Sequence, residues 1–169
     1  TQAVYFQFLR RLHQLVATAG LKLSVTIRLH QLGMQAPPVD KGTLMLYNTG
    51  DFRQLSNQKP ILDPEVVRQY IGGLRSYSLP LNAAYPLFRI RALFRSGKFV
   101  GIIHTKDEYP VLPTDSVAVR ETTLADLQSV QQLINKHRLD VHNEIILYDI
   151  NNRNLTKYSS NDYEKIYNP

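Results

Sequence analysis

Residues 24–51, SVTIRLHQLGMQAPPVDKGTLMLYNTGD, decide the fold that we expect for this chain. At the start of this stretch, residues 23–29 alternate apolar and polar side chains with the period of a β-strand that has two unlike faces. Residues 43–49 contain a short apolar run, as in a strand that is covered on both sides. The loop between the two strands contains Pro37 and Pro38 and is too short for a crossover helix of normal length.

Both expected strands end in polar residues. Arg28 and His30 leave one face of the first strand, and Tyr47, Asn48 and Asp51 follow the second. In barrels and doubly wound sheets, larger polar groups project where the strands end, at their carboxyl ends. We therefore expect these side chains to open into one shared polar hollow, with the apolar faces of the strands packed beneath helices.

The rest of the chain supplies further elements of the same kind. Asp63 and Pro64 form a strong helix start, and Thr123 with Asp126 resembles a capping box. In order, we expect a helix at residues 2–19 with one broad apolar stripe, the two strands, a helix from residue 63, a strand at 79–84, a hairpin at 88–104 turning at residues 96–97, a loop at 106–114, a helix from 123, a strand at 144–150 and a closing helix at 160–167.

This order predicts an α/β fold with mainly parallel strands. Four main strands separated largely by helices fit half of a (β/α)8 barrel with an inserted β-hairpin, because a full barrel needs roughly 250 residues. In this reading residues 1–169 form one α/β domain, the carboxyl-terminal portion of a longer barrel protein. Asn82 is expected on the inward face near the end of the third strand, and Asp149 near the end of the fourth. The hairpin is expected to have a basic face, made of Arg89, Arg91, Arg95 and Lys98.

Composition narrows the classes of function. The chain has 169 residues, 43% of them hydrophobic and 20% charged, which is ordinary for a globular protein. Its net charge of +6 is spread without a Lys/Arg-rich cluster, so nucleic acid is not favoured as a partner. No apolar run approaches the roughly 18 residues of a membrane span, and the amphipathic opening helix lacks a signal-peptide cleavage site. The start in mid-helix without an initiator Met suggests a mature chain or a fragment.

Three blocks of residues carry a family resemblance: TIRLHQ at 26–31, PVDKGTLMLYNTG at 38–50 and LPLNAAYP at 79–86, followed by LFRSGKFVGII at 93–103. Over about residues 1–150 the chain resembles the carboxyl-terminal part of an uncharacterised bacterial family of glycosidase-like (β/α) barrel proteins. The resemblance implies a barrel fold whose amino-terminal strands lie outside this chain, and a secreted, periplasmic or lipid-anchored location. It implies no assigned reaction, and the family has an acid where this chain has Asn82.

Residues suited to chemistry are few. Glycoside hydrolysis usually needs two carboxyl groups flanking one bond. The candidates are Asp51 and Asp149 near strand ends, with Asp40 and Glu108 on loops, and none lies in a recognised catalytic motif. Catalytic residues therefore stay unassigned.

Binding roles are easier to assign than catalytic ones. Arg28 and His30 are suited to bind a carboxylate, a phosphate or a sugar hydroxyl, or to serve structure alone. Tyr47 and Asn48 are suited to stack on and hydrogen-bond a sugar, or simply to end the strand. The five histidines have no metal-ligand spacing, cysteine is absent, and nucleotide fingerprints are missing, so no metal or cofactor is predicted.

Three hypotheses follow. The chain is a carbohydrate-active enzyme or a remnant of one; or it is a non-catalytic carbohydrate-binding module using the same cleft; or it is a structural module that completes its barrel with another chain, either the missing amino-terminal half or a second copy. The expected ligand-binding residues are Arg28, His30, Tyr47, Asn48, Asp51, Asn82 and Asp149.

Overall fold

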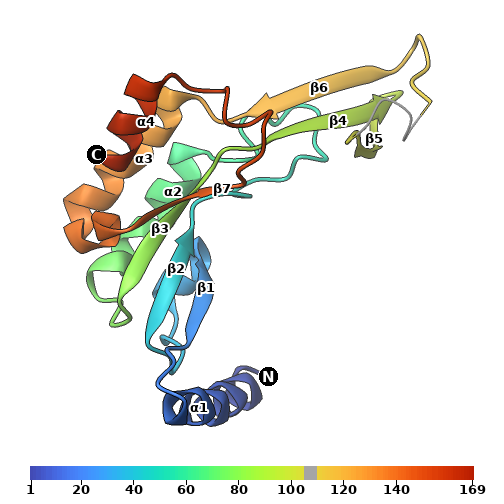
Figure 1. Ribbon diagram of the computed structural model, residues 1–169. Coiled ribbons are helices and arrows are strands. Elements are labelled where there is room, and N and C mark those ends of the chain that lie inside the picture. Colours follow the sequence, from blue (N-terminus) through green and yellow to red (C-terminus); the bar gives the residue numbers. More distant parts are fainter. Residues whose placement is uncertain (105–109) are drawn as a thin grey trace.

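The structure is a computed structural model that describes residues 1–104 and 110–169 (Figure 1). Helices and strands alternate along most of the chain. Their order is α1 (Gln2–Thr18), β1 (Ser24–Arg28), the 3₁₀ turn η1 (Leu29–Gly33), β2 (Lys41–Met45), α2 (Pro64–Tyr70), η2 (Ile71–Arg75), β3 (Leu81–Pro86), β4 (Arg89–Arg95), β5 (Lys98–Ile102), β6 (Ser116–Glu121), α3 (Leu124–His137), η3 (Leu139–Asn143), β7 (Ile145–Tyr148) and α4 (Ser160–Tyr167).

Four strands form a parallel sheet in the order β1-β2-β3-β7, as the α/β prediction required. Paired residues in parallel strands point to the same face, so the register separates the two faces of the sheet. Ile27, Leu44, Ala83 and Ile145 are aligned on one face. The next row, Arg28, Met45, Ala84 and Ile146, lies on the other.

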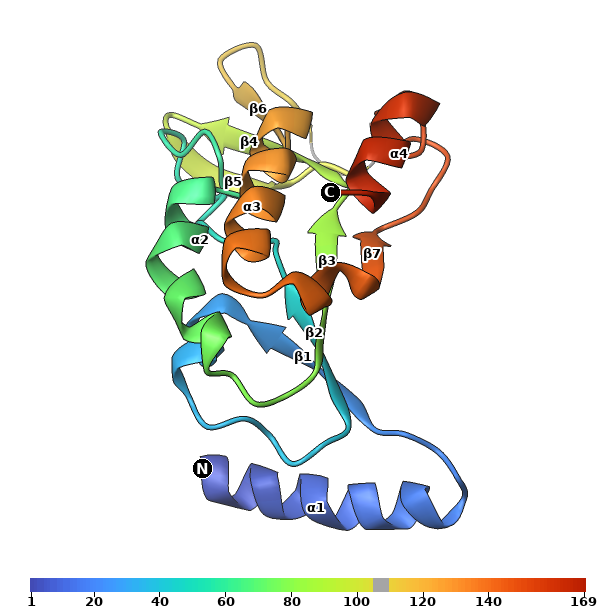
Figure 2. The same cartoon turned by 90° about the vertical axis from the view of Figure 1, so that its left-hand side faces the viewer.

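Helices α2 and α3 cover only the first of these faces (Figure 2). Leu44 and Ala83 are fully buried there against Val67 of α2 and Val130 of α3. The row that contains Ile146 carries no helix, and Ile146 is 37% exposed. One face of the sheet is therefore a hydrophobic core. The other, here called the open face, carries no helix among the described residues and is exposed at Arg28 and Ile146 but buried at Ala84.

A second, antiparallel sheet projects from the body as an arm, in the order β5-β4-β6 (Figure 1). The hairpin β4–β5 is confirmed: Ser96 and Gly97 have φ values of 50° and 76°, and a type I′ turn needs a positive φ at both central residues. Strand β6 was not predicted. Its apolar residues Val117 and Val119 remain exposed. Strand β6 therefore lacks the buried apolar face that usually makes a strand recognisable in a sequence.

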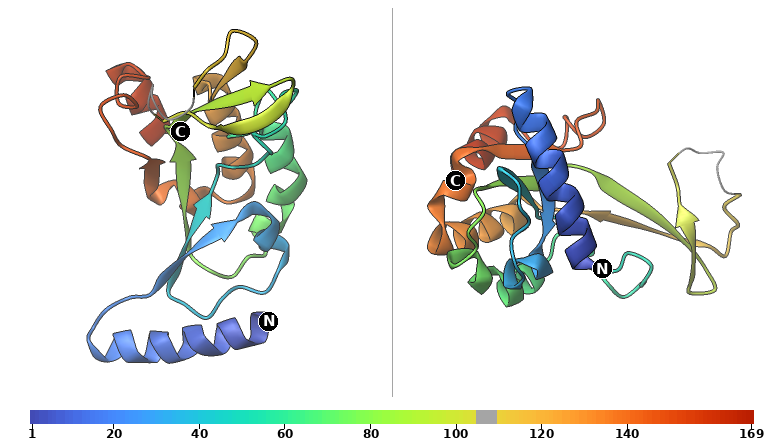
Figure 3. Two further views of the ribbon diagram at one scale, coloured as in Figure 1. Left: turned by 90° about the vertical axis from the view of Figure 1, so that its right-hand side faces the viewer. Right: turned by 90° about the horizontal axis from the view of Figure 1, so that it is seen from below.

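Helix α1 lies at the foot of the parallel sheet, where the strands begin (Figure 3). It is held by His13, whose Nε2 is 2.9 Å from Oδ2 of Asp40. The same Asp40 oxygen accepts a hydrogen bond from the backbone N–H of Leu23 at 2.7 Å. The expected apolar stripe is buried only in part: Phe6 and Leu9 are covered, whereas Phe8 is 57% exposed.

The local signals for helix starts are confirmed. Asp63 accepts the N–H of Glu65 at the start of α2, and Thr123 accepts the N–H of Asp126 at the start of α3. The closing helix runs over Ser160–Tyr167, the predicted residues. The expected strand ends were less accurate. At β2, for example, the strand was expected to end at Thr49 but ends at Met45.

Candidate functional site

Aromatic rings gather at the carboxyl ends of three neighbouring parallel strands. Tyr47 follows β2, Phe88 follows β3, and Tyr148 ends β7. The Tyr47 and Tyr148 rings are stacked, with centroids 5.2 Å apart, and the edge of Phe88 packs against both at 6.0 and 6.1 Å. Such pairs contribute about 1 kcal/mol each beyond their buried area, so they hold the ends of the strands together. Tyr148 remains 51% exposed, which leaves part of its ring available to a ligand.

A small pocket of about 150 Å³ lies beside this cluster and brings together Arg28, His30, Tyr47 and Asn48. Burial, and then the neighbouring Tyr148, raise the pKa of Tyr47, and the charge of Arg28 opposes that rise. The Tyr47 phenol therefore stays protonated at neutral pH and can donate a hydrogen bond. The sequence suggested that His30 leaves the polar face of β1. The strand instead ends at Arg28, where a 3₁₀ turn begins, so His30 lies on η1. The Arg28 N–H donates to Oε1 of Gln31 at 2.7 Å, and this bond closes the turn.

A larger cleft of about 1300 Å³ opens between the arm and the segment that follows β7. Asn48 lines both hollows, and its φ of 54° turns the chain sharply after Tyr47. The lining combines aromatic rings, amides and basic groups. Its main members are Phe52, Phe88, Tyr148, Arg89, Arg91, Arg153, Asp149, Asn151, Asn152 and Asn154.

The wall made by residues 149–156 is held by its own side chains. Asn154 is 5% exposed, and its Nδ2 donates to the Asp149 carboxylate at 2.7 Å and to the Asp149 carbonyl at 3.2 Å. Asn151 also donates to Asp149, at 3.2 Å. Asp149 therefore lies at the end of β7, as predicted, with its carboxylate engaged by two amides.

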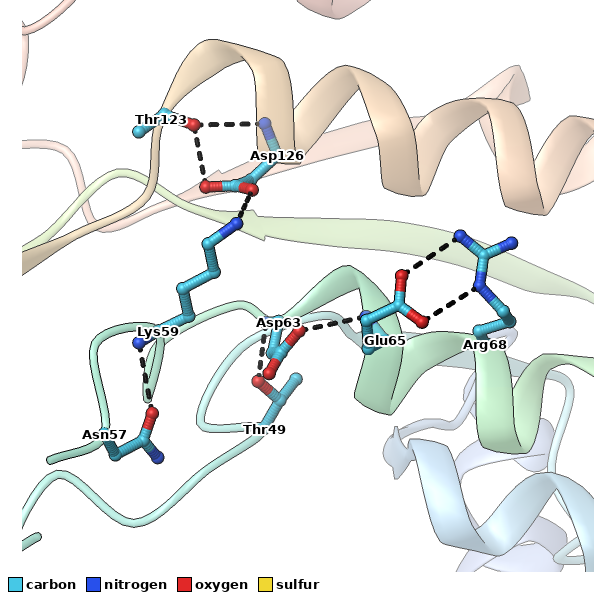
Figure 4. Close-up of polar contacts among 8 residues, drawn as sticks. All are labelled: Thr49, Asn57, Lys59, Asp63, Glu65, Arg68, Thr123 and Asp126. Carbon is cyan, nitrogen blue, oxygen red and sulfur yellow. Dashed lines mark hydrogen bonds and ion pairs between the residues drawn. The ribbon is translucent and has the colours of Figure 1, made fainter.

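The opposite rim, residues 49–63, is anchored at both ends (Figure 4). The Thr49 hydroxyl accepts the N–H of Asp63 at 2.9 Å, which ties the two ends of the loop together. Lys59 reaches across to α3, where its ammonium is 2.6 Å from Oδ1 of Asp126. Thr123 donates to the other oxygen of Asp126 at 2.7 Å. These contacts hold in place the loop that carries Phe52.

Two of the predicted site residues lie outside both hollows. Asp51 binds Arg53 through two hydrogen bonds at 2.8 and 3.1 Å, which lower the pKa of Asp51. Asn82 is not near the end of β3 but is its second residue, at the foot of the sheet, because the strand begins only after Pro80. It lies there beside Glu144, which pairs with Lys41. The buried Oδ1 of Asn82 has no hydrogen-bond partner among the described residues.

Of the two loop acids predicted as candidates, the structure describes only Asp40. Asp40 holds α1, and Glu108 lies outside the described residues.

Sequence reasoning missed most of the larger cleft. The signal that was present is the run NNRN at 151–154, a polar cluster directly after a strand. The basic hairpin face was recognised, but only the structure separates its members. Arg89 and Arg91 line the cleft, whereas Arg95 is bound to Asp115 at 2.9 Å.

Within residues 1–104 and 110–169, no three potential ligand side chains gather closely enough to hold a metal ion. Over the same residues, no helix combines the length and apolar character that a bilayer crossing needs. Comparison of the chain with known protein families, with characterised proteins and with solved structures gives no match in any of the three.

Proposed function

We propose that this chain is a glycosidase-like (β/α) barrel protein that binds carbohydrate in the cleft beside Tyr148. One observation carries the proposal: the stacked pair of Tyr47 and Tyr148 stands at the carboxyl ends of the parallel strands, next to a cleft lined by asparagine amides. Ligands of parallel α/β sheets bind at this edge of the sheet.

The chemistry of the lining supports a sugar. A half-exposed tyrosine offers a flat apolar surface with a polar tip, which suits the C–H face of a pyranose ring. Asparagine amides both donate and accept hydrogen bonds and therefore match hydroxyl groups, which do the same. The small pocket with Arg28, His30, Tyr47 and Asn48 offers room for one substituent of the bound sugar.

Asp149 is the one carboxylate among the described residues that line the cleft. Hydrolysis usually needs two carboxyl groups. We therefore propose binding as the function of this chain by itself and treat turnover as a separate outcome.

The experiment is calorimetric titration of the protein with a panel of oligosaccharides, with product analysis of each mixture. The Tyr148→Ala variant should bind the best ligand about tenfold more weakly, because it loses the stacking surface. Tyr167→Ala is the matched control: Tyr167 is similarly exposed but lies on α4, away from the cleft, so its affinity should not change. Failure of every sugar to bind, or equal losses in both variants, contradicts the proposal.

A second candidate is an assembly role, which the open face of the sheet favours. Helices cover one face only, and β1 and β7 are edge strands. Around a two-fold axis, β7 of one sheet can pair with β1 of a second one. The result is the eight parallel strands of a closed barrel, which removes both edges.

This candidate predicts a dimer in solution. Light scattering should give twice the mass of the chain, and Ile146→Lys on the open face should convert the dimer to a monomer without unfolding. A monomeric mass for the unmodified protein at every concentration measured contradicts pairing with a second copy.

A further inference from the structure

We infer that the ligand of the larger cleft is an acidic carbohydrate, bearing carboxylate or sulfate groups that the cleft arginines bind. This inference rests on the proposed function and specifies the class of sugar. Its basis is the charge of the lining. Arg89, Arg91 and Arg153 face the cleft, and Asp149 is the acid among the described lining residues.

No acid in the described part of the chain forms an ion pair with the three arginines, although Glu121 lies across the β4–β6 ladder from Arg89. Within the described part of the chain, the guanidinium groups of Arg89, Arg91 and Arg153 make no ion pair or hydrogen bond. Asp149 is engaged by amides instead. Arg95, four residues beyond Arg91 on the same strand, binds both oxygens of Asp115 at 2.9 and 3.0 Å. The cleft thus holds exposed guanidinium groups that are available to a ligand.

Their placement suits a chain of charged sugars. Arg89 and Arg91 are two residues apart on β4, so both side chains leave the same face of that strand, roughly 7 Å apart along it. Arg153 comes from the other wall, on the segment after β7. A guanidinium presents paired N–H groups that match the two oxygens of a carboxylate or sulfate, and such charge-assisted bonds are stronger than neutral ones.

Lys157 adds positive charge close to Arg89. Its ammonium is buried without a hydrogen-bond partner within the described residues and lies 5.2 Å from the centre of the Tyr158 ring. Burial lowers the pKa of Lys157 to about 8, Glu121 opposes this, and Arg89 adds to it. The group therefore remains mostly protonated at pH 7. Glu121 stands opposite Arg89 on β6, so the cations of this region outnumber its acids.

The test compares one oligosaccharide in two forms, an oligouronate and the same molecule with its carboxyl groups reduced to alcohols, by titration at low salt. The acidic form should bind about tenfold to a hundredfold more tightly. Arg91→Met should remove most of that difference while leaving the affinity for the reduced form unchanged. Arg75→Met is the control, because Arg75 is an exposed arginine on η2 outside the cleft. A sulfated oligosaccharide in parallel decides between carboxylate and sulfate.

The outcomes separate the two proposals. If both forms bind equally and Tyr148→Ala weakens both, the acidic class is wrong and carbohydrate binding stands. If no sugar binds, both proposals fail. Tighter binding of a single-stranded oligonucleotide than of any acidic sugar overturns the inference in favour of nucleic acid.

Discussion

At the scale of single residues, the protonation of His142 links the stability of the fold to pH. Its Nδ1 is 2.6 Å from Oδ1 of Asn135, and its Nε2 is 2.6 Å from the hydroxyl of the buried Tyr85. An amide oxygen only accepts, so Nδ1 carries the proton and Nε2 accepts from Tyr85. Burial lowers the pKa of His142 to about 4. The folded protein therefore keeps this ring neutral at a pH where the unfolded chain protonates it.

This difference predicts a loss of stability in weak acid. Between the unfolded pKa of about 6.5 and the folded value, the unfolded chain binds one proton more, so the free energy of unfolding falls as the pH falls. The total loss should be about 2 kcal/mol, allowing for the solvent that reaches the ring. Urea unfolding at a series of pH values should show it in the unmodified protein and in His30→Gln, but not in His142→Gln. The same pH dependence in both variants would count against this account.

Two adjacent glycines allow a matched comparison. A Cβ added at Gly73 would lie 2.6 Å from the backbone oxygen of Leu32, whereas one added at Gly72 meets nothing within 4 Å. Gly73→Ala should therefore lower the free energy of unfolding by about 1–3 kcal/mol, because η1 and η2 must move apart. Gly72→Ala should change it by less than about 1 kcal/mol. Urea denaturation midpoints measure both, and equal effects would show that the close approach does not matter.

At the scale of elements, the start of α3 also anchors the rim of the cleft. The Asp126 carboxylate is mostly buried and accepts from both Lys59 and Thr123. Asp126→Ala should lower the free energy of unfolding by about 1–2 kcal/mol, since it removes a first-turn acid together with the hydrogen bonds that its carboxylate accepts from Lys59 and Thr123. Amide exchange should also accelerate in residues 52–59.

Glu65 is the control for this prediction, because it is an exposed first-turn acid on α2 that pairs with Arg68. Glu65→Ala should change stability by at most about 0.5 kcal/mol and leave the rim unaffected. Unchanged exchange at residues 52–59 in Asp126→Ala would show that the rim does not depend on this contact.

Helix starts were predictable and strand β6 of the arm was not, for the same physical reason. A cap such as Thr123 acts within three residues, so the sequence displays it directly. Strand β6 exists because it pairs with β4 across about 25 residues of chain, and its own side chains are largely exposed. His30 was expected to leave the same face of the first strand as Arg28, but β1 ends at Arg28, where a hydrogen bond from the Arg28 N–H to Gln31 starts a turn. The alternation of apolar and polar residues does not reveal that turn.

At the scale of the whole molecule, the two sheets have separate hydrophobic clusters. The arm contributes Ile90, Ala92 and Phe94 to a small cluster with Ile61, apart from the main core beneath α2 and α3. Fewer buried side chains should make the arm the less stable part. Phe94→Ala should therefore accelerate amide exchange in β4 and β5 while β1–β3 keep their protection.

Leu44→Ala, in the main core, should instead lower the stability of the entire chain by about 2–5 kcal/mol. Hydrogen exchange followed by mass spectrometry distinguishes the two patterns. Simultaneous loss of protection in both sheets of Phe94→Ala would show that the arm and the body unfold as one unit.

The sequence by itself determined the helix starts, the hairpin, the strand periodicity and the polar character of the strand ends, because each depends on neighbours within a few residues. Only the tertiary structure decided which polar residues meet: it brought Arg89, Arg91 and Arg153 to one cleft and left Asn82 at the foot of the sheet. Alternation along a strand fixes which side chains share a face. The register against other strands, set by contacts distant in the chain, fixes where on that face they lie.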